Sequence, residues 1–385
     1  MNRMIFTNMM QFMFQPYAKR PTPSDSIYLL EILRFVSCIG VILYHYQHFI
    51  TYRGDTYDSK ALPMQTFFSW FYQNGDSGVR VFWCLSGIVF AHVYQTALIQ
   101  KTISASEFVW RRFARLYPLH LLTLVVVAIL QWLFAATSNM PYFIYQFNNI
   151  KHFALNMMFA NYWGFQDGTS FNGPVWSVSI ELIAYSIFLI LAIFVRKLPH
   201  IFHSAPLLIV LWTGVLWYCL SRSLTSSDFI LDCISLFMIG MILYTAWMIL
   251  PNFVVFTTIV YLIISYQKND FISRNLEVLE IPFTSLMIAV FIALLHFSPV
   301  FSRLKTGRLL STSLGKITYG MYMIHFPIQL LMVLFSENLV RLDFVSLPVL
   351  LSFLGLTMGL SYVCYSFFEF PIQRALRKWF INLRA

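Results

Sequence analysis

The chain has 385 residues, of which 58% are apolar and only 11% charged, and its mean hydropathy is +0.68. Because a soluble domain carries about 25% charged residues, this composition excludes a cytosolic enzyme, a secreted disulfide scaffold and a disordered chain. The five cysteines lie in apolar runs and form no CxxC pair, so they indicate neither a disulfide framework nor a zinc site. We therefore expect an all-α, polytopic membrane protein.

Ten apolar runs approach the length of about 20 residues that a membrane-spanning helix needs. A further stretch, 151–165, is apolar and aromatic but too short, and we expect it to be an interfacial or re-entrant segment. In chain order, the predicted spans are 27–48, 79–99, 117–136, 172–195, 206–220, 229–249, 252–266, 281–297, 315–336 and 346–368.

The basic residues predict the orientation of these spans. With the N-terminus inside, 16 of the 26 Lys and Arg residues fall in inner segments and 8 in outer ones. This bias places both termini in the cytoplasm and favours an even number of spans. The surplus of positive charge then follows from membrane topology and indicates no nucleic-acid partner.

The N-terminal segment 1–24 contains three prolines and no continuous apolar core, so we expect an interfacial leader that stays attached. Residues 25–375 would form one transmembrane domain, and residues 376–385 would form a basic cytoplasmic tail.

The first predicted span contains Glu31 and, deeper along the chain, Arg34 and His45; ionisable side chains are costly inside a membrane and therefore indicate function. At about 100° per residue, the eleven-residue spacing brings Arg34 and His45 to one helix face, about 16 Å apart along the axis. A charged group and an imidazole on one stripe are typical of the wall of a polar channel. The alternative is that Arg34 extends to the inner interface and His45 makes an interfacial contact.

The second span is interrupted by Ser86 and Gly87, which either belong to a polar pathway or allow close helix approach. Arg80 lies near its outer mouth. The segment WRRFARLYPLH then places three basic residues at the inner face. Guanidinium groups bind phosphates, but the residues alone favour a topology anchor. These three residues are Arg111, Arg112 and Arg115.

Two later spans also carry ionisable groups. In NGPVWSVSIELIAY, the first three residues predict a turn, Trp176 lies at interface level, and Glu181 lies at a depth like that of His45. A membrane carboxylate near an imidazole can orient or charge it. His325 is a second mid-membrane imidazole, for which a polar pathway and a packing role are both open.

In this order, the segments LEILRFVSCIGVILYH, GVRVFWCLSGIVF, RRFARLYPL, PVWSVSIELIAY, LGKITYGMYMIHFPI and FFEFPIQ resemble the acyltransferase 3 family of integral membrane acyltransferases. The resemblance covers about residues 27–375. It matches Arg34 and His45 to the family's essential pair, and the three arginines to its inner-face motif. It also matches Trp176, Ser177 and Glu181 to a Trp-Ser-x-x-x-Glu element, and His325 to the late histidine. Arg80 and Trp83 depart from the pattern common in the family. This departure bears on which acceptor the protein would use.

The resemblance implies transfer of an acetyl or other short acyl group to a hydroxyl of a cell-envelope or exported polysaccharide. Acyl-CoA would be the donor substrate, with its phosphates held by the three arginines, and no resident cofactor or metal is expected. His45 would act as general base, Glu181 would orient it, and Arg34 would stabilise negative charge. An acyl-histidine intermediate is an alternative to direct transfer. The location implied is the cytoplasmic membrane of a bacterium, in contact with membrane lipid.

Two other functions remain open at this stage. A transporter or flippase of a lipid-linked sugar or acyl carrier would line a path with the same polar residues, although the chain has no evident internal repeat. A membrane O-acyltransferase of the other large histidine-dependent class would load lipids or proteins, and the early Arg-x10-His spacing argues against it. The sequence predicts neither the acceptor sugar nor the oligomeric state.

Overall fold

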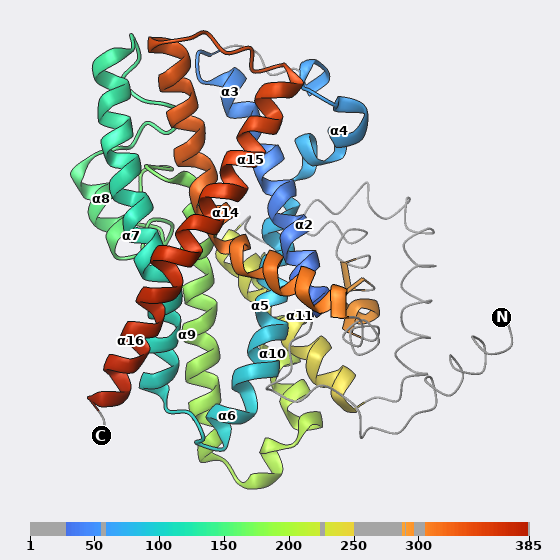
Figure 1. Ribbon diagram of the computed structural model, residues 1–385. Helices are drawn as coiled ribbons and strands as arrows, with labels where there is room; N and C mark the ends of the chain where they lie inside the picture. Colours follow the sequence, from blue (N-terminus) through green and yellow to red (C-terminus); the bar gives the residue numbers. More distant parts are fainter. Residues whose placement is uncertain are drawn as a thin grey trace, which may run out of the picture. The chain divides into compact units, whose positions relative to one another are not determined.

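The computed structural model describes residues 28–54, 59–223, 228–249, 287–288, 290–295 and 305–383. Every regular element within these ranges is helical (Figure 1), as the composition predicted. Eight of the described helical stretches are long and apolar enough to cross a membrane. The chain is therefore a multi-pass membrane protein.

These eight stretches match eight of the ten predicted spans. Predicted span 252–266 lies outside the described residues, and of predicted span 281–297 only 287–288 and 290–295 are described, both as helix. The eight stretches are Tyr28–Thr51, Ser77–Ile99, Ala105–Thr137, Gly173–Lys197, Ala205–Arg222, Phe229–Ile249, Ser311–Asn338 and Leu347–Asn382.

The stretch 151–165 does not form a span, as predicted. It begins within helix α8 (Ile150–Met157), whose eight residues rise only about 12 Å. The side chain of Asn149 caps this helix by accepting a hydrogen bond from the backbone N–H of His152 at 3.1 Å. Beside the helix, Lys151 donates to Asp167 at 2.9 Å, and this hydrogen bond lowers the pKa of the exposed Asp167 carboxyl.

The chain divides into two compact units. Unit 1 takes in Met1–Leu33, Val81–Ile103 and Ile187–Thr312. Unit 2 takes in Arg34–Arg80, Ser104–Ser186 and Ser313–Ala385. Apart from Ser86, every candidate site residue from the sequence belongs to unit 2.

In unit 2, the first span packs against the late helix α14 (Lys305–Asn338). This span consists of α2 (Tyr28–Tyr44), a 3₁₀ turn at His45–Gln47 and α3 (His48–Thr51). Cys38 lies 3.5 Å from the carbonyl oxygen of Thr318 on α14. Near the other end of the span, the Tyr46 hydroxyl donates to the carbonyl oxygen of Phe344 at 2.9 Å. The first of these contacts joins the span to α14, and the second joins it to the segment that follows α14.

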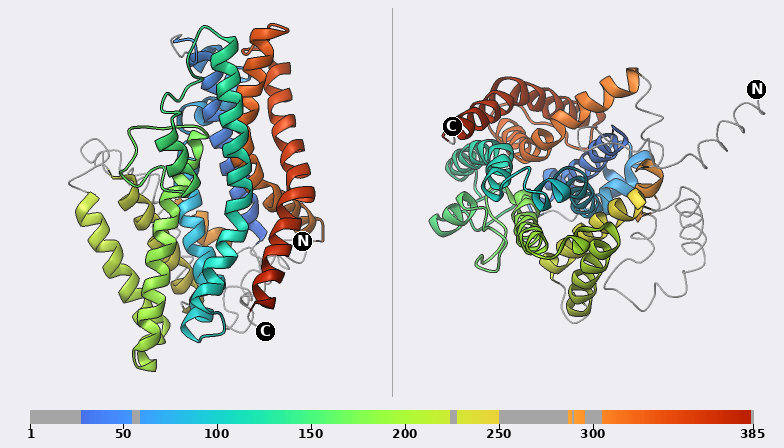
Figure 2. Two further views of the ribbon diagram at one scale, coloured as in Figure 1. Left: turned by 90° about the vertical axis from the view of Figure 1, so that its left-hand side faces the viewer. Right: turned by 90° about the horizontal axis from the view of Figure 1, so that it is seen from below.

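Helix α7 (Ala105–Thr137) begins at a capping residue and runs beside α16 (Phe370–Asn382), as Figures 1 and 2 show. The Ser104 hydroxyl accepts a hydrogen bond from the N–H of Glu107 at 3.1 Å, the pattern that starts a helix. Trp110 joins the two helices, because its indole N–H donates to the carbonyl oxygen of Leu376 at 2.8 Å. The arginine motif therefore lies beside the basic C-terminal helix.

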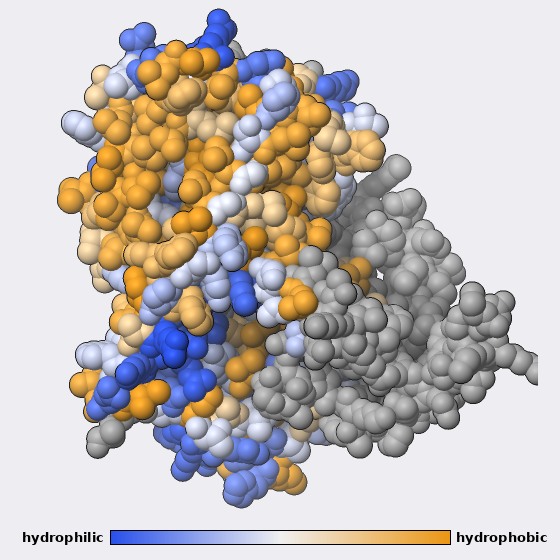
Figure 3. Space-filling view, in the orientation of Figure 1, coloured by the Kyte–Doolittle hydropathy of each residue, from blue (hydrophilic) through white to orange (hydrophobic). Residues whose placement is uncertain are grey.

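The surface of unit 2 separates by polarity along these helices. Figure 3 shows a broad apolar face over α7 and α15 (Leu347–Cys364), with hydrophilic side chains below it over α16 and the first turns of α7. Exposed apolar residues of α7 and α15 include Ile129, Trp132 and Leu351. The exposed bases on α16 are Arg374, Arg377 and Lys378. An apolar band ending in a basic cluster is the pattern of a membrane-embedded surface that reaches its interface.

In unit 1, α5 (Ser77–Phe90) crosses α11 (Phe229–Ile249) at two glycines. A Cβ atom on Gly87 would overlap the carbonyl oxygen of Phe237, and one on Gly240 would overlap that of Cys84. The backbones therefore approach too closely for any larger residue. A π-helical turn, Ala91–Gln95, and α6 (Thr96–Ile99) complete the second span.

Candidate active site

Two imidazoles meet in unit 2, one from the first span and one from α14. His45 Nδ1 lies 3.0 Å from His325 Nε2, and the two ring planes are only 10° apart. This near-coplanar arrangement lets the N–H of one ring point at the lone pair of the other. His325 is fully buried, whereas His45 is partly exposed. The structure thus brings together the two histidines that the sequence indicated separately.

The hydrogen bonds fix which nitrogens carry protons. His325 Nδ1 lies 2.7 Å from the carbonyl oxygen of Tyr322, and a carbonyl oxygen only accepts, so Nδ1 of His325 is protonated. In a neutral ring, Nε2 of His325 then accepts, and His45 Nδ1 must be the donor. His45 therefore keeps an unprotonated Nε2, the nitrogen that a general base uses.

A glutamine braces this imidazole pair. Gln329, one turn along α14 from His325, donates from Nε2 to the carbonyl oxygen of His45 at 2.7 Å. Its Oε1 accepts from Nδ1 of His48 at 3.2 Å. The His48 ring lies 5.0 Å from that of His45, centroid to centroid. The 3₁₀ turn that carries His45 is therefore held by side chains on both sides.

The start of helix α9 (Trp176–Lys197) contacts the same turn of α14. The predicted turn at Asn172 to Pro174 is a 3₁₀ turn, and the Asn172 amide donates to the carbonyl oxygen of Met323 at 2.9 Å. Ser177 Oγ lies 2.6 Å from the Tyr322 hydroxyl, which also donates to the carbonyl oxygen of Pro174 at 2.8 Å. The Trp-Ser element thus positions the backbone that holds His325.

Glu181 lies one helical turn beyond Ser177, on the same face of α9. Its Oε1 oxygen is fully buried, and its carboxyl lies within electrostatic range of the hydroxyls of Tyr319 and Tyr322. The sequence predicted that Glu181 lies near His45, and the described contacts of Glu181 are instead with these two tyrosines. The described contacts include no hydrogen bond between Glu181 and His45.

Polar side chains form a continuous stripe along α14. Gln329, His325, Tyr322 and Tyr319 follow one another at spacings of three or four residues, which keeps them on one side of the helix. At the far end of the stripe, the Tyr319 hydroxyl donates to the carbonyl oxygen of Leu116 at 2.7 Å. The stripe therefore links the imidazole pair to α7, next to the arginine motif.

Two of the three predicted arginines are paired with carboxylates. Arg111 contacts Glu107, one turn before it, at 2.6 Å. Arg115 contacts Glu369 at 2.5 Å, and its guanidinium lies 5.5 Å from the centre of the Tyr319 ring. Glu369 is only 1% exposed, so the Arg115 pair is largely withdrawn from water. Arg112 is partly exposed beside them.

A family model described as an acyltransferase domain matches residues 27–366. The chain belongs to the acyltransferase 3 family. Among curated proteins it is similar to "Protein 2 in picA locus" of Rhizobium radiobacter, with 32% identity over 107 residues, or 28% of this chain and 47% of that protein. The chain thus spans about half the length of the curated relative it matches. No solved structure matches the chain.

The other residues predicted from the sequence of this acyltransferase 3 protein make no described contact with the histidine pair. Arg34 is partly exposed on α2, Trp176 packs 5.2 Å from the Tyr162 ring, and Arg80 is partly exposed at the edge of unit 2. Ser86 is partly exposed in unit 1, next to Gly87. For Gly87, the close helix approach expected from small residues is confirmed by its contact with α11.

Four residues that contact the predicted site residues were not singled out from the sequence: His48, Tyr322, Gln329 and Glu369. The signal for three of them is present, because polar residues three or four positions apart within an apolar span indicate a shared polar face. Glu369 belongs to the segment FFEFPIQ that carries the family resemblance, but its place in a π-helical turn, Tyr365–Glu369, is a distortion that the sequence does not reveal.

The part of this acyltransferase 3 chain that is described contains no group of three His, Cys, Asp or Glu residues placed to hold a metal ion. His45, His48 and His325 cluster, but each uses its Nδ1 atom in a hydrogen bond. The chemistry available at the site is therefore that of an oriented imidazole, a buried carboxylate and nearby guanidinium groups.

Proposed function

We propose that the protein moves an acetyl, or another short acyl group, from acyl-CoA to a hydroxyl of a cell-envelope or exported polysaccharide. The observation that carries this proposal is the His45–His325 pair, which leaves His45 Nε2 with a lone pair inside an apolar helix bundle. Family membership supports acyl transfer as the reaction class. An oriented imidazole supports a hydroxyl as the acceptor, because a hydroxyl must lose a proton to attack.

The proposed step conserves atoms and protons. The acceptor hydroxyl gives its proton to His45 Nε2 as its oxygen attacks the acyl carbonyl carbon. The carbon–sulfur bond of the thioester then breaks, and the thiolate of coenzyme A takes the proton from His45. His325 keeps Nδ1 of His45 hydrogen-bonded throughout, so that the base nitrogen is always the one facing the substrate.

The arginine motif is the place where we propose that the donor, acyl-CoA, first binds. Guanidinium groups bind phosphates through charge-assisted hydrogen bonds, and Arg111, Arg112 and Arg115 lie at the end of unit 2 that also carries the basic helix α16. The charge distribution predicts that this end faces the cytoplasm, where acyl-CoA is made. The polar stripe on α14 offers a route from there to His45, with Arg34 on the neighbouring α2.

Two further groups act on charge that develops during the reaction. Glu181, within electrostatic range of Tyr322, would stabilise the protonated form of the histidine pair. Arg34 would stabilise the negative charge on the acyl carbonyl oxygen or position the donor. The same His45 Nε2 would be the nucleophile if an acyl-histidine forms.

The test is an acetyl-transfer assay in bacterial membranes with radiolabelled acetyl-CoA and the surface glycan as acceptor. His45→Ala and Arg34→Ala should each lower turnover by about 100-fold or more. His120→Gln is the matched control, because His120 is also buried and bonded to a backbone carbonyl, that of Asn156 at 2.7 Å, but contacts none of the three clustered histidines. Wild-type turnover in either site variant, at normal abundance, would contradict the proposal.

The two routes differ when the acceptor is absent. Purified protein mixed with acetyl-CoA alone should keep its mass if transfer is direct. A gain of one acetyl group that disappears in His45→Ala would establish the acyl-histidine route.

A further inference from the structure

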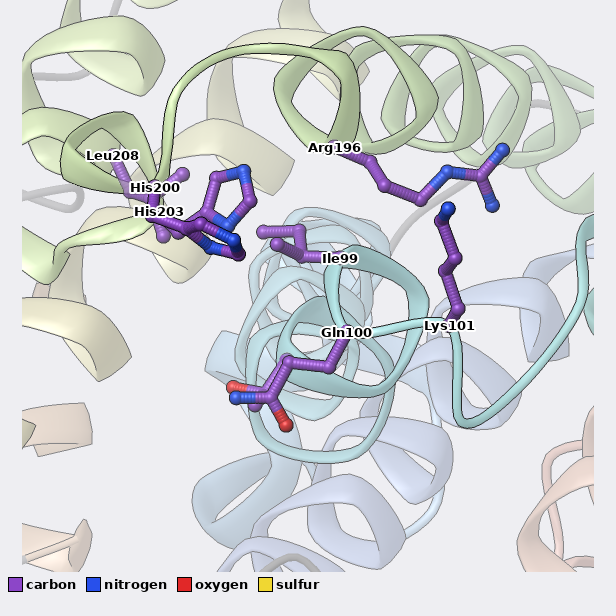
Figure 4. A pocket seen from close by; sticks show the side chains of 8 residues that line it. Ile99, Gln100, Lys101, Arg196, His200, His203 and Leu208 are labelled. Atoms are coloured by element: carbon purple, nitrogen blue, oxygen red, sulfur yellow. The ribbon is translucent and has the colours of Figure 1, made fainter.

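An open pocket of about 500 Å³ lies in unit 1 (Figure 4). The histidine pair belongs to unit 2. Four basic or imidazole side chains line the pocket, and they come from the end of α6, the end of α9 and the following 3₁₀ turn. They are Lys101, Arg196, His200 and His203. No acidic residue lines the pocket.

The two cations converge without a protein counter-charge. Figure 4 shows the Lys101 side chain pointing toward the side chain of Arg196, with the two coming from different segments of unit 1. Neither side chain has a hydrogen bond or ion pair with another described residue. Two like charges that face one shared space repel each other, and an anion placed between them removes that repulsion. The arrangement is therefore that of an anion site.

The backbone at Lys101 is held in a conformation that lysine rarely adopts. Its φ angle is 63°, in the left-handed region where glycine usually ends a helix. The N–H of Ile103 bonds to the carbonyl oxygen of Ala97 at 3.2 Å and closes the end of α6 around it. A glycine would fit this turn with less strain, so the lysine side chain is the feature that needs an explanation.

The turn that carries the two histidines is also fixed. His203 Nε2 donates to the carbonyl oxygen of Val195 at 3.0 Å, and the rings of His200 and His203 lie 5.0 Å apart. This bond ties the turn after α9 back to the helix itself, next to Arg196. The basic wall of the pocket is therefore preformed.

The pocket also has an apolar side. Ile99 and Leu208 also line it and are 5% and 4% exposed. Beside it, Ile201 and Phe202 expose 67% and 43% of their surface. Basic groups next to exposed apolar side chains are suited to a membrane interface, where a phosphate carries an apolar chain.

We propose that this pocket binds the phosphate of an amphiphilic anion, held between Lys101 and Arg196. Two sources share that chemistry: the headgroup of an anionic phospholipid and the phosphates of soluble coenzyme A. Both cations belong to segments that the charge distribution places on the cytoplasmic side, which both molecules can reach. The pocket residues belong to unit 1 and the arginine motif to unit 2, and the proposal does not depend on the proposed acyl transfer.

The experiment measures binding to the delipidated, purified full chain by native mass spectrometry. One arm titrates phosphatidylglycerol against phosphatidylcholine, and the other titrates coenzyme A. The variants are Lys101→Gly, Arg196→Gln and their combination. Lys197→Gln is the matched control, because Lys197 is the next residue, is exposed and does not line the pocket.

We expect each variant to weaken binding of one probe by about tenfold, and the double variant by more, while Lys197→Gln changes it less than twofold. Lys101→Gly should melt no lower than wild type, since glycine fits the left-handed backbone, and this separates lost binding from lost folding. Loss of phosphatidylglycerol binding identifies a lipid site, and loss of coenzyme A binding identifies a soluble ligand. Unchanged binding of both probes in the double variant, or equal loss in Lys197→Gln, would overturn the proposal.

Discussion

His45 Nδ1 and His325 Nε2 lie 3.0 Å apart, although the two residues are separated by 280 positions in the chain. The proposed base is thus on one span and the group that sets its tautomer on another. Since Gln329 on the same helix also holds the carbonyl of His45, both the ring and the backbone of the base are positioned by α14. A shift of α14 against α2 would therefore change the position of the proposed base.

His325 should act through His45 as a positioning residue. In His325→Leu the Nδ1–H of His45 loses its acceptor, and the ring is free to adopt the other tautomer. We expect kcat to fall by about 100-fold or more, with the KM for acyl-CoA nearly unchanged. In His325→Gln, the side-chain carbonyl can accept from His45, so a substantial part of kcat should return.

Steady-state assays in membranes, normalised to protein abundance, distinguish this role from a structural one. His120→Gln serves again as the control for losing a buried imidazole. Equal loss in the Leu and Gln variants, or a raised KM with unchanged kcat, would show that His325 does not set the tautomer.

Gln329 should matter for stability as well as for activity. Replacing it by Leu leaves the carbonyl oxygen of His45 and the Nδ1–H of His48 without their partner inside the bundle. Each such loss costs about 1–3 kcal/mol, so the thermal midpoint in detergent should fall clearly. A Leu variant as stable as wild type would contradict the bracing role.

Much of the architecture was predictable because the bilayer imposes it. A span must be long and apolar, so the runs containing Arg34, His45, Glu181 and His325 could be placed by length alone. The failure of 151–165 to span followed from the same rule, and α8 is indeed short. The same rule predicts the depth of a residue along its span, and for this reason we expected Glu181 near His45.

The lateral arrangement was not predictable from one sequence. Which helices touch depends on side-chain packing between distant segments, and neither His45 with His325 nor Arg115 with Glu369 has a local signal. The stripe of Tyr319, Tyr322 and Gln329 was readable as a polar face, but its direction depends on how α14 is rotated in the bundle. The left-handed backbone at Lys101 carries no sequence signal either, since glycine is the residue expected there.

Replacing Arg115 and replacing Glu369 should lower the stability of the protein by different amounts. Arg115 is 27% exposed and Glu369 only 1%, so removing the arginine leaves a carboxylate that water barely reaches. Arg115→Gln should therefore destabilise by about 3 kcal/mol or more, and Glu369→Gln by less. The double variant should be more stable than Arg115→Gln alone, because it carries no buried charge.

Thermal unfolding of the three purified variants checks this order. The exposed pair Lys151–Asp167 is the control, since both side chains are about half exposed and Lys151→Gln should shift the midpoint little. If Arg115→Gln proves no more harmful than Lys151→Gln, the buried pair is not a stability determinant.

Two glycines of unit 1, one at the crossing of α5 and α11 and one on α10, should respond differently to replacement by alanine. A Cβ on Gly87 would overlap the carbonyl oxygen of Phe237, which is backbone and cannot move aside, so Gly87→Ala should force the helices apart and cost about 2 kcal/mol or more. Gly214, on α10 (Ala205–Ser223), has nothing within 4 Å of the same added atom. Gly214→Ala should therefore leave the thermal midpoint unchanged or raise it, because alanine favours the helix by about 0.5–1 kcal/mol. Equal midpoints for the two variants would mean that α5 and α11 do not meet at Gly87.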